Sequence, residues 1–155
     1  MSEFLKDSVG TMPQPEPAVI VAEIGCNHMG RMDIARKMIE VAKSHCDVDY
    51  VKFQKRNPSE CLTEAQYKMP HPVQHNSFGD TYGAHREFLE FDREEHRQLI
   101  DYCHQIGIRY STSVWDVTSA REMAVLSPDY LKVPSALNLN FELLAVLCDE
   151  YGGNI

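Results

Sequence analysis

A regular alternation of short apolar segments with longer amphipathic ones limits the folds open to this chain. Residues 18–22 (AVIVA) form a continuous apolar run rich in β-branched side chains, which is typical of a strand buried on both faces. Apolar residues then recur at helical spacing between charged residues over residues 32–45, which predicts a helix. The composition predicts three further strands, at residues 49–54, 108–113 and 130–133.

Three further helices are expected between and after these strands, at residues 92–106, 118–126 and 141–150. Asp92 and Glu95 have the spacing of a capping box, and Gly107 is placed to end the helix that they begin. Asn140 is placed to cap the last helix. Residues 154–155 follow paired glycines and resemble the first residues of a fifth strand.

Four strand and helix repeats predict an α/β fold with parallel (β/α) units and right-handed crossovers. The sheet closes either as an eight-stranded TIM-type barrel or as an open doubly wound sheet. The first turn, EIGCNHMG, contains only Gly25 and Gly30, so it lacks the GxGxxG spacing of a dinucleotide-binding sheet, and the barrel is favoured. A complete barrel needs roughly 250 residues. Residues 18–155 are therefore expected to form a truncated domain, the N-terminal half of a barrel, preceded by a flexible arm at residues 1–17.

Charge and composition exclude several classes of protein. The net charge of -8 disfavours binding to nucleic acid, which requires a basic face. No apolar stretch approaches the roughly 20 residues that span a bilayer, and the N-terminus lacks the apolar run of a signal peptide, so no membrane partner and a cytoplasmic location are expected. The five cysteines are scattered without a CxxC pair and are expected to be buried, reduced thiols.

Polar side chains interrupt the C-terminal ends of all four predicted strands, where the working residues of parallel α/β folds gather. They are Glu23, Lys52, Gln54, Ser111, Thr112, Ser113, Lys132 and Ser135. Two lysines beside several hydroxyls predict a compact site for a small phosphate or carboxylate.

Individually, these residues have simpler interpretations. Lys52 is also consistent with a lysine that extends its stem along a strand edge, and Thr112 with a residue chosen for its β propensity. Glu23 directly follows apolar strand residues, so it is expected to be partly buried and to need a partner or a role in proton transfer.

The polar segment 55–90 is far longer than an ordinary strand-to-helix loop, which suggests a function. Tyr82, Arg86 and Glu87 within it form either a substrate lid or a structural surface cluster. His28 is either an ordinary loop histidine or a substrate contact. Five other histidines are expected at the surface: His71, His75, His85, His96 and His104.

Five ordered motifs together resemble the N-acetylneuraminate (sialic acid) synthase family. The motifs are AEIGCNHMG at 22–30, VKFQ at 51–54, YGAHREFLEF at 82–91, GIRYSTSVWD at 107–116 and YLKVPSALNLNFELL at 130–144. The resemblance covers residues 18–155 in the family's order. It implies an eight-stranded barrel followed by an antifreeze-like domain, and a homodimer for the full-length enzyme.

The resemblance also implies an activity, the condensation of phosphoenolpyruvate with an N-acylated hexosamine to form a sialic (nonulosonic) acid. C3 of the enol would attack the open-chain aldehyde, which a divalent metal, Mn²⁺ or Mg²⁺, would polarise. The residues that match phosphoenolpyruvate-binding positions are Lys52, Thr112, Lys132 and Ser135, and Glu23 matches an acidic residue near the reacting carbons. The candidates for other substrate contacts are Asn27, His28, Gln54, Tyr82 and Arg86.

The chain departs from the family pattern in two respects. Residues 136–138 read ALN where many members have a glutamate that contacts the sugar. The family's metal-binding histidines lie in the second half of the barrel, so no metal ligand is expected in this chain and the isolated chain is expected to be inactive. Two alternatives remain: another phosphoenolpyruvate-dependent barrel synthase that acts on a phosphorylated aldose, and a non-catalytic truncated fragment.

Overall fold

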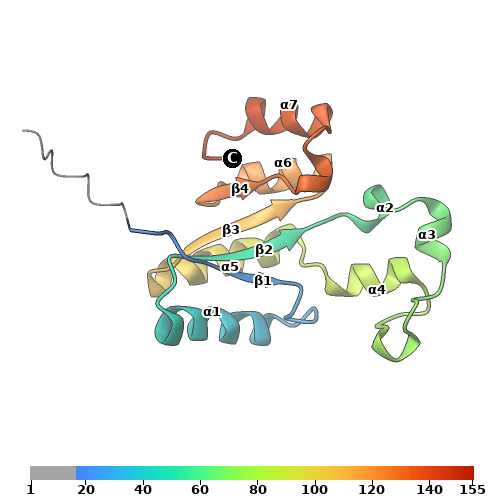
Figure 1. The fold of residues 1–155 in the computed structure, drawn as a ribbon, viewed down its shortest axis with the longest axis horizontal. Coiled ribbons are helices and arrows are strands. Elements are labelled where there is room, and N and C mark those ends of the chain that lie inside the picture. The colour runs from blue at the N-terminus through green and yellow to red at the C-terminus, as the bar shows by residue number, and fades with distance from the viewer. Residues whose placement is uncertain (1–16) are drawn as a thin grey trace, which may run out of the picture.

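The computed structural model describes residues 17–155, and its centre is a parallel sheet of four strands (Figure 1). The strands are β1 (Val21–Gly25), β2 (Tyr50–Lys55), β3 (Arg109–Val114) and β4 (Tyr130–Lys132), and they pair in chain order. The predicted arm at residues 1–17 lies, apart from Pro17, outside the described residues.

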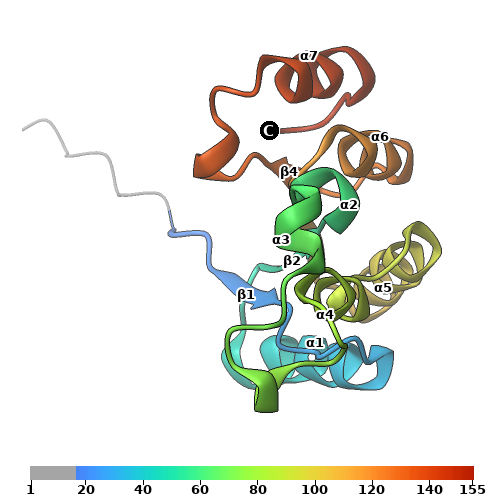
Figure 2. The same cartoon turned by 90° about the vertical axis from the view of Figure 1, so that its right-hand side faces the viewer.

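Four long helices cover one side of the sheet: α1 (Met32–Cys46), α5 (Arg93–Ile106), α6 (Val117–Leu126) and α7 (Phe141–Glu150). Figure 2 shows α1, α5 and α6 in an arc on the same side of the strands. Each helix packs against the next along the chain, α1 on α5, α5 on α6, and α6 on α7. The described residues therefore form four consecutive β/α units, half of the eight that a TIM-type barrel contains.

Local sequence signals produce the predicted helix boundaries. Asp92 and Glu95 form a complete capping box, and Gly107 ends α5 in the left-handed region at φ 74°. The side chain of Asn140 accepts a hydrogen bond from the Leu143 N–H at 3.1 Å and caps α7. Asn154 forms a parallel bridge with Tyr130, as expected for the beginning of a fifth strand.

Two predictions about local structure were wrong. The first strand begins at Val21, and residues 18–21 are exposed, because β1 lies at the edge of the sheet rather than between two neighbours. Segment 55–90 is largely helical and contains α2 (Pro58–Cys61), α3 (Glu64–Lys68), the short 3₁₀ helix η1 (Gln74–Asn76) and α4 (Tyr82–Leu89). These helices project beyond the C-terminal end of β2 (Figure 1).

The hydrophobic core lies between the sheet and the helices, where Phe53 and Tyr110 stack at 5.4 Å between ring centroids. The prediction that His85 and His96 are surface residues was wrong, since both are buried. His96 sits in the core within 2.6 Å of the Tyr110 hydroxyl.

All five cysteines are free thiols, as predicted, but only Cys103 is buried. Cys46, Cys61 and Cys148 are exposed, so the expectation that the thiols are buried fails for these three. Among the described residues, no helix is both long and apolar enough to cross a bilayer.

Candidate functional site

The strand register brings most of the predicted polar residues onto one face of the sheet. Glu23 pairs with Lys52 and Lys52 with Ser111, while Ser113 pairs with Lys132. Paired residues on neighbouring strands point to the same side of a sheet, and residues two apart on one strand do so as well. Glu23, Lys52, Ser111, Ser113 and Lys132 therefore share the face opposite to the helices, and we call this set the inner-face cluster.

Lys52 is the centre of the inner-face cluster. Its ammonium group forms an ion pair with the Glu23 carboxylate and donates a hydrogen bond to Ser113 Oγ at 3.2 Å. The Lys52 side chain is only 9% exposed, whereas the Glu23 side chain is 51% exposed, so Glu23 is less buried than expected. Ser111 is fully buried and its hydroxyl has no hydrogen-bond partner among the described residues. A buried hydroxyl without a partner costs free energy, which a bound acceptor would offset.

Two of the predicted anion-binding residues do not join the inner-face cluster through their side chains. Thr112 pairs with Phe53 and Leu131, so its side chain points toward the helices, opposite to Lys52. Ser135 is exposed and begins the 3₁₀ turn η2 (Ser135–Leu137) beyond β4. Ser111 and Ser113 occupy the places beside Lys52 instead. Their spacing in the sequence shows that they share a face opposite to Thr112, but only the register shows that this face is the one with Lys52.

The turn after β1 brings Gln54 and Asn27 to the edge of this cluster. Gly25 adopts a φ of +59°, and a Cβ atom at this position would lie 3.5 Å from Gln54 Nε2, 3.6 Å from Glu23 Oε1 and 3.9 Å from Asn27 Nδ2. These three polar side chains thus converge on the Gly25 backbone. Asn27 is held there by donating to the Ile24 carbonyl at 2.8 Å.

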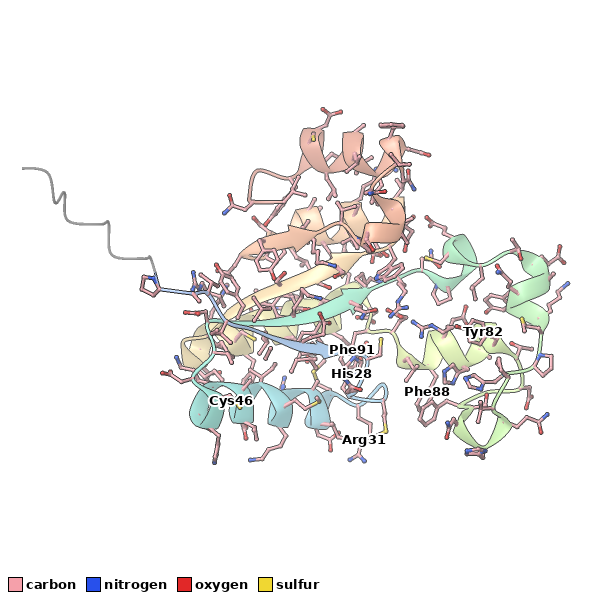
Figure 3. The ribbon with its side chains drawn as sticks, in the orientation of Figure 1. His28, Arg31, Cys46, Tyr82, Phe88 and Phe91 are labelled. Carbon is pink, nitrogen blue, oxygen red and sulfur yellow. The ribbon has the colours of Figure 1, made fainter. Side chains whose placement is uncertain are left out.

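His28 has a structural role in this fold. Its ring is buried and stacks on Phe91 with 4.1 Å between centroids (Figure 3). Its Nδ1 accepts a hydrogen bond from the Gly30 N–H at 3.2 Å. Burial lowers the His28 pKa from 6.5 to about 4, so the ring is neutral at pH 7. The His28 ring therefore packs against Phe91 and Phe53, and its contact with a substrate stays a prediction.

A second polar group lies beyond the ends of β2 and β3. Arg56 and Arg86 both contact the Glu90 carboxylate, at 3.0 and 3.2 Å, and the Glu90 side chain is only 6% exposed. Burial raises the pKa of Glu90, and the two guanidinium groups oppose that rise. Arg86 pairs with Glu90 rather than forming the predicted surface cluster with Glu87. We call Arg56, Arg86 and Glu90 the arginine cluster.

Next to the arginine cluster lies a cavity of about 160 Å³, and Tyr82, the remaining predicted contact, is one of its walls. Its other lining residues are Arg56, Pro58, Cys61, Leu62, Arg86 and Trp115. The Arg56 guanidinium stacks over the Trp115 ring at 5.0 Å from its centroid. Sequence reasoning missed Arg56 because no local pattern shows that it lies beside Arg86.

The metal that the resemblance implies would need several ligands in one place. Within residues 17–155, no three histidine, cysteine or acidic side chains are close enough to hold a metal ion. Glu23 is in addition paired with Lys52. The described residues alone therefore do not fit a divalent metal site.

The chain resembles known proteins in both sequence and structure. The NeuB family matches residues 38–155. The chain is 36% identical over 128 residues to human N-acetylneuraminate-9-phosphate synthase, a match that covers 83% of this chain and 35% of that protein. It is 28% identical over 126 residues to the N,N'-diacetyllegionaminic acid synthase of Campylobacter jejuni, covering 81% of this chain and 37% of that enzyme.

Among solved structures, the fold matches an N-acetylneuraminic acid synthetase from Leptospira borgpetersenii with a TM-score of 0.69 and 25% identity, over 87% of this chain and 42% of that one. A spore coat polysaccharide biosynthesis protein E from Chromobacterium violaceum matches in fold with a TM-score of 0.67 and 19% identity, covering 83% of this chain and 37% of that chain. The chain spans about a third of the length of the sequence relatives described above. Since the family match covers most of the sequence and extends through three of the four β/α units, the chain belongs to the NeuB family.

Proposed function

We propose that this chain supplies the phosphoenolpyruvate-binding part of an enzyme that condenses phosphoenolpyruvate with an N-acylated hexosamine to form a nonulosonic acid. The observation that carries the proposal is the inner-face cluster, in which Lys52 and Lys132 flank Ser113 on one face of the sheet. Two ammonium groups with serine hydroxyls match the charge and the oxygen acceptors of a phosphate or carboxylate. The names of the two relatives, N-acetylneuraminate-9-phosphate synthase and N,N'-diacetyllegionaminic acid synthase, agree with this chemistry.

In the proposed reaction, C3 of phosphoenolpyruvate forms a carbon–carbon bond with the sugar aldehyde, and water adds at C2 before phosphate leaves. Lys52 and Lys132 hold the anion and stabilise the charge that develops on it. In this proposal the half-exposed Glu23 carboxylate, which is ion-paired with Lys52, accepts the proton of the incoming water. The Ser111 hydroxyl, which has no partner in the described part of the chain, gives the anion a further donor.

The acceptor sugar and the final product are not defined by the inner-face cluster. One relative is named for a 9-phosphate product, and the other for an acid without a phosphate. Gln54 and Asn27, which converge beside Glu23 at Gly25, are the proposed contacts to the acceptor. The divalent metal, the homodimer and a cytoplasmic location stay proposals for a chain of full family length.

Steady-state kinetics test the assignment in a chain of full family length that contains residues 17–155. Lys52→Ala or Lys132→Ala should raise the KM for phosphoenolpyruvate by about tenfold or more, with a much smaller effect on the KM for the sugar. Lys37→Ala is the matched control, because Lys37 is exposed on α1 and its ion pair among the described residues is with Glu40. Equal effects of the Lys52 and Lys132 variants on both substrates would show that these residues do not form the phosphoenolpyruvate site.

A second pair of variants separates the two neighbouring hydroxyls of β3. Ser113→Ala should raise the KM for phosphoenolpyruvate, because it removes the hydroxyl beside Lys52. Thr112→Val should leave that KM nearly unchanged, because the Thr112 side chain faces the helices. The reverse pattern would support the assignment of Thr112 that the resemblance implies, and would contradict the one drawn from the register.

A further inference from the structure

The loop between α3 and α4 packs on α4, and two histidine rings lie at the contact (Figure 1). We call residues 70–80 the α3–α4 loop. Its Gly79 approaches α4 so closely that a Cβ atom there would lie 2.8 Å from the Cβ atom of Ala84. We propose that His71 and His85 form a latch that holds the α3–α4 loop on α4 while both rings are neutral, and releases it when they bind protons. The latch does not depend on the condensation proposed above.

Backbone N–H groups of the loop donate to both rings. His85 lies on α4 with only 8% of its surface exposed, and its Nδ1 accepts a hydrogen bond from the Phe78 N–H at 3.2 Å. His71 Nδ1 accepts one from the Val73 N–H at 3.0 Å. A ring nitrogen accepts a hydrogen bond only while it carries no proton. Protonation of His85 would therefore remove the acceptor that ties the Phe78 backbone to α4.

The two rings are close enough for their charges to oppose one another. Their centroids are 4.3 Å apart, and the Tyr82 ring lies beside both, at 5.8 Å from His71 and 6.1 Å from His85. His71 Nδ1 is also 2.8 Å from the Val73 carbonyl oxygen, so a protonated His71 can donate there and keep its place. Its charge then repels a second proton on the buried His85. That repulsion is relieved when the loop leaves α4.

The other surroundings of His85 also disfavour a charged ring. Its pKa lies below the ordinary value of 6.5, because burial disfavours the charged form and the charges of His71 and Arg86 act in the same direction. Among the described residues, His104 is the histidine that has a carboxylate partner. In the closed loop His85 is therefore held neutral, whereas in the open loop it is free to bind a proton near pH 6.5.

The carboxylates on and around α4 are engaged elsewhere or lie in water. Glu64 of α3, Glu60 of α2 and Glu87 of α4 each have a partner outside the latch. Glu90 is held by the arginine cluster, and Asp80 of the loop is exposed. An exposed carboxylate stabilises a nearby cation only weakly, because water and salt screen it. These acids therefore do not compensate a charge on the two rings.

The other contacts between the loop and α4 are weak. Phe78 stacks on Phe88 with 4.7 Å between centroids, but the two residues are 43% and 50% exposed. Pro70 and Pro72 have no backbone N–H to donate to α4. Segments that bury little apolar surface open locally at a low cost in free energy. Loss of the acceptor on His85 is therefore enough to shift the loop toward an open form.

Opening of the loop reaches the cavity beside the arginine cluster. Tyr82 begins α4, is one wall of that cavity, and donates its N–H to the Met69 carbonyl at 2.7 Å, at the base of the loop. His71 supports one side of the Tyr82 ring. Release of the loop removes this support, so the latch links mild acid to the wall of the cavity.

Hydrogen–deuterium exchange tests the latch in a chain of full family length that contains residues 17–155. Mass spectrometry of peptides from residues 70–80, corrected for the intrinsic exchange rate at each pH, compares amide protection at pH 7.5 and pH 5.5. At one pH unit below 6.5, a proton that His85 binds only in the open loop should lower the protection by roughly tenfold. His85→Gln keeps an acceptor for the Phe78 N–H but does not titrate, so it should remove most of this change. His71→Gln should reduce the change, because it removes the opposing charge.

Two controls separate the latch from other effects of acid. His75→Gln should keep the tenfold change, because His75 is exposed in η1 of the same loop and does not belong to the latch. Peptides from α5 report on global unfolding, to which His96 contributes, and their change with pH should be the same in the parent and in His85→Gln.

Loop protection that is equal at the two pH values in the parent protein would overturn the proposal. A tenfold loss that persists in both His85→Gln and His71→Gln would also overturn it, as would a loss in the loop that only matches the loss in α5. Thermal unfolding establishes that each variant is folded. If His85→Gln is not folded, His71→Gln tests the latch, since His71 is only partly buried.

Discussion

Two buried histidines should make the protein lose stability in mild acid. Burial lowers the pKa of His28 from 6.5 to about 4 and that of His96 from 6.5 to about 3, and for His96 the charges of Lys55 and His28 act in the same direction. Below pH 6.5 each histidine therefore binds a proton in the unfolded chain. In the folded protein it stays neutral until the pH reaches its lowered pKa. The contribution of the two neutral histidines to the free energy of unfolding is fully present above pH 6.5. It is lost as the pH falls toward 4 for His28 and toward 3 for His96.

The size of this loss follows from the pKa values. One pH unit changes the free energy of unfolding by about 1.36 kcal/mol for each proton that only the unfolded chain binds. As the pH falls from 6.5 to 5, each histidine should thus lower the free energy of unfolding by about 2 kcal/mol, and both together by about 4 kcal/mol. That is a large part of the roughly 5–15 kcal/mol by which a domain is stable.

Urea unfolding at pH 7 and pH 5 measures the effect. His28→Gln and His96→Gln should each reduce the difference between the two pH values by about 2 kcal/mol, because glutamine does not titrate. Glutamine at position 96 also keeps a polar partner for the Tyr110 hydroxyl. His45→Gln is the control, since His45 is exposed at the end of α1, and it should leave the pH dependence unchanged. A stability difference that neither buried-site variant reduces, or imidazole NMR signals of His28 and His96 that titrate near pH 6.5, would refute this reasoning.

Two further pairs of substitutions test local contacts by their effect on the urea midpoint. Gly30→Ala should destabilise the protein by more than about 2 kcal/mol, because φ is +67° and the new Cβ would overlap the Phe88 carbonyl oxygen. Gly107→Ala is the control, since φ is +74° there but a new Cβ would have no atom within 4 Å, and it should destabilise the protein by only about 1 kcal/mol. Similar losses for the two glycines would contradict the close approach at Gly30. Asp116→Ala should lower the free energy of unfolding by about 3 kcal/mol, since it removes both the cap of α6 and the hydrogen bond from the Asn57 N–H. Asp92→Ala removes an exposed cap alone and should lower it by about 1 kcal/mol. A loss at Asp116 no greater than that at Asp92 would show that the contact to Asn57 adds nothing.

Segment 55–90 shows where sequence reasoning stops. Its helices are short and lack a long apolar period, so neither propensity nor periodicity separates them from a loop. Because α4 was not predicted, the contact between Arg86 and Glu90 was not predicted either, although the two residues are four apart in the sequence. The burial of Glu90 also depends on Arg56, which arrives from the end of a different strand.

The face on which a strand residue lies was a second limit. A sequence places Thr112 within a strand, but an uncertainty of one residue in the strand's register reverses the side to which every side chain points. Only the pairing of Lys52 with Ser111, and of Phe53 with Thr112, decides which hydroxyls face the lysines. His96 is similar, because its helix position does not reveal that Tyr110 and Phe91 enclose it.

The sequence by itself determined the order of the four strands and the four long helices, the caps at Asp92 and Asn140, and the presence of polar residues at the strand ends. These features depend on neighbours within a few residues, whose spacing is written directly in the chain. The tertiary structure alone decided which polar groups meet, because the inner-face cluster and the arginine cluster each join residues from separate elements. Such contacts depend on strand register and helix packing, which no local pattern contains.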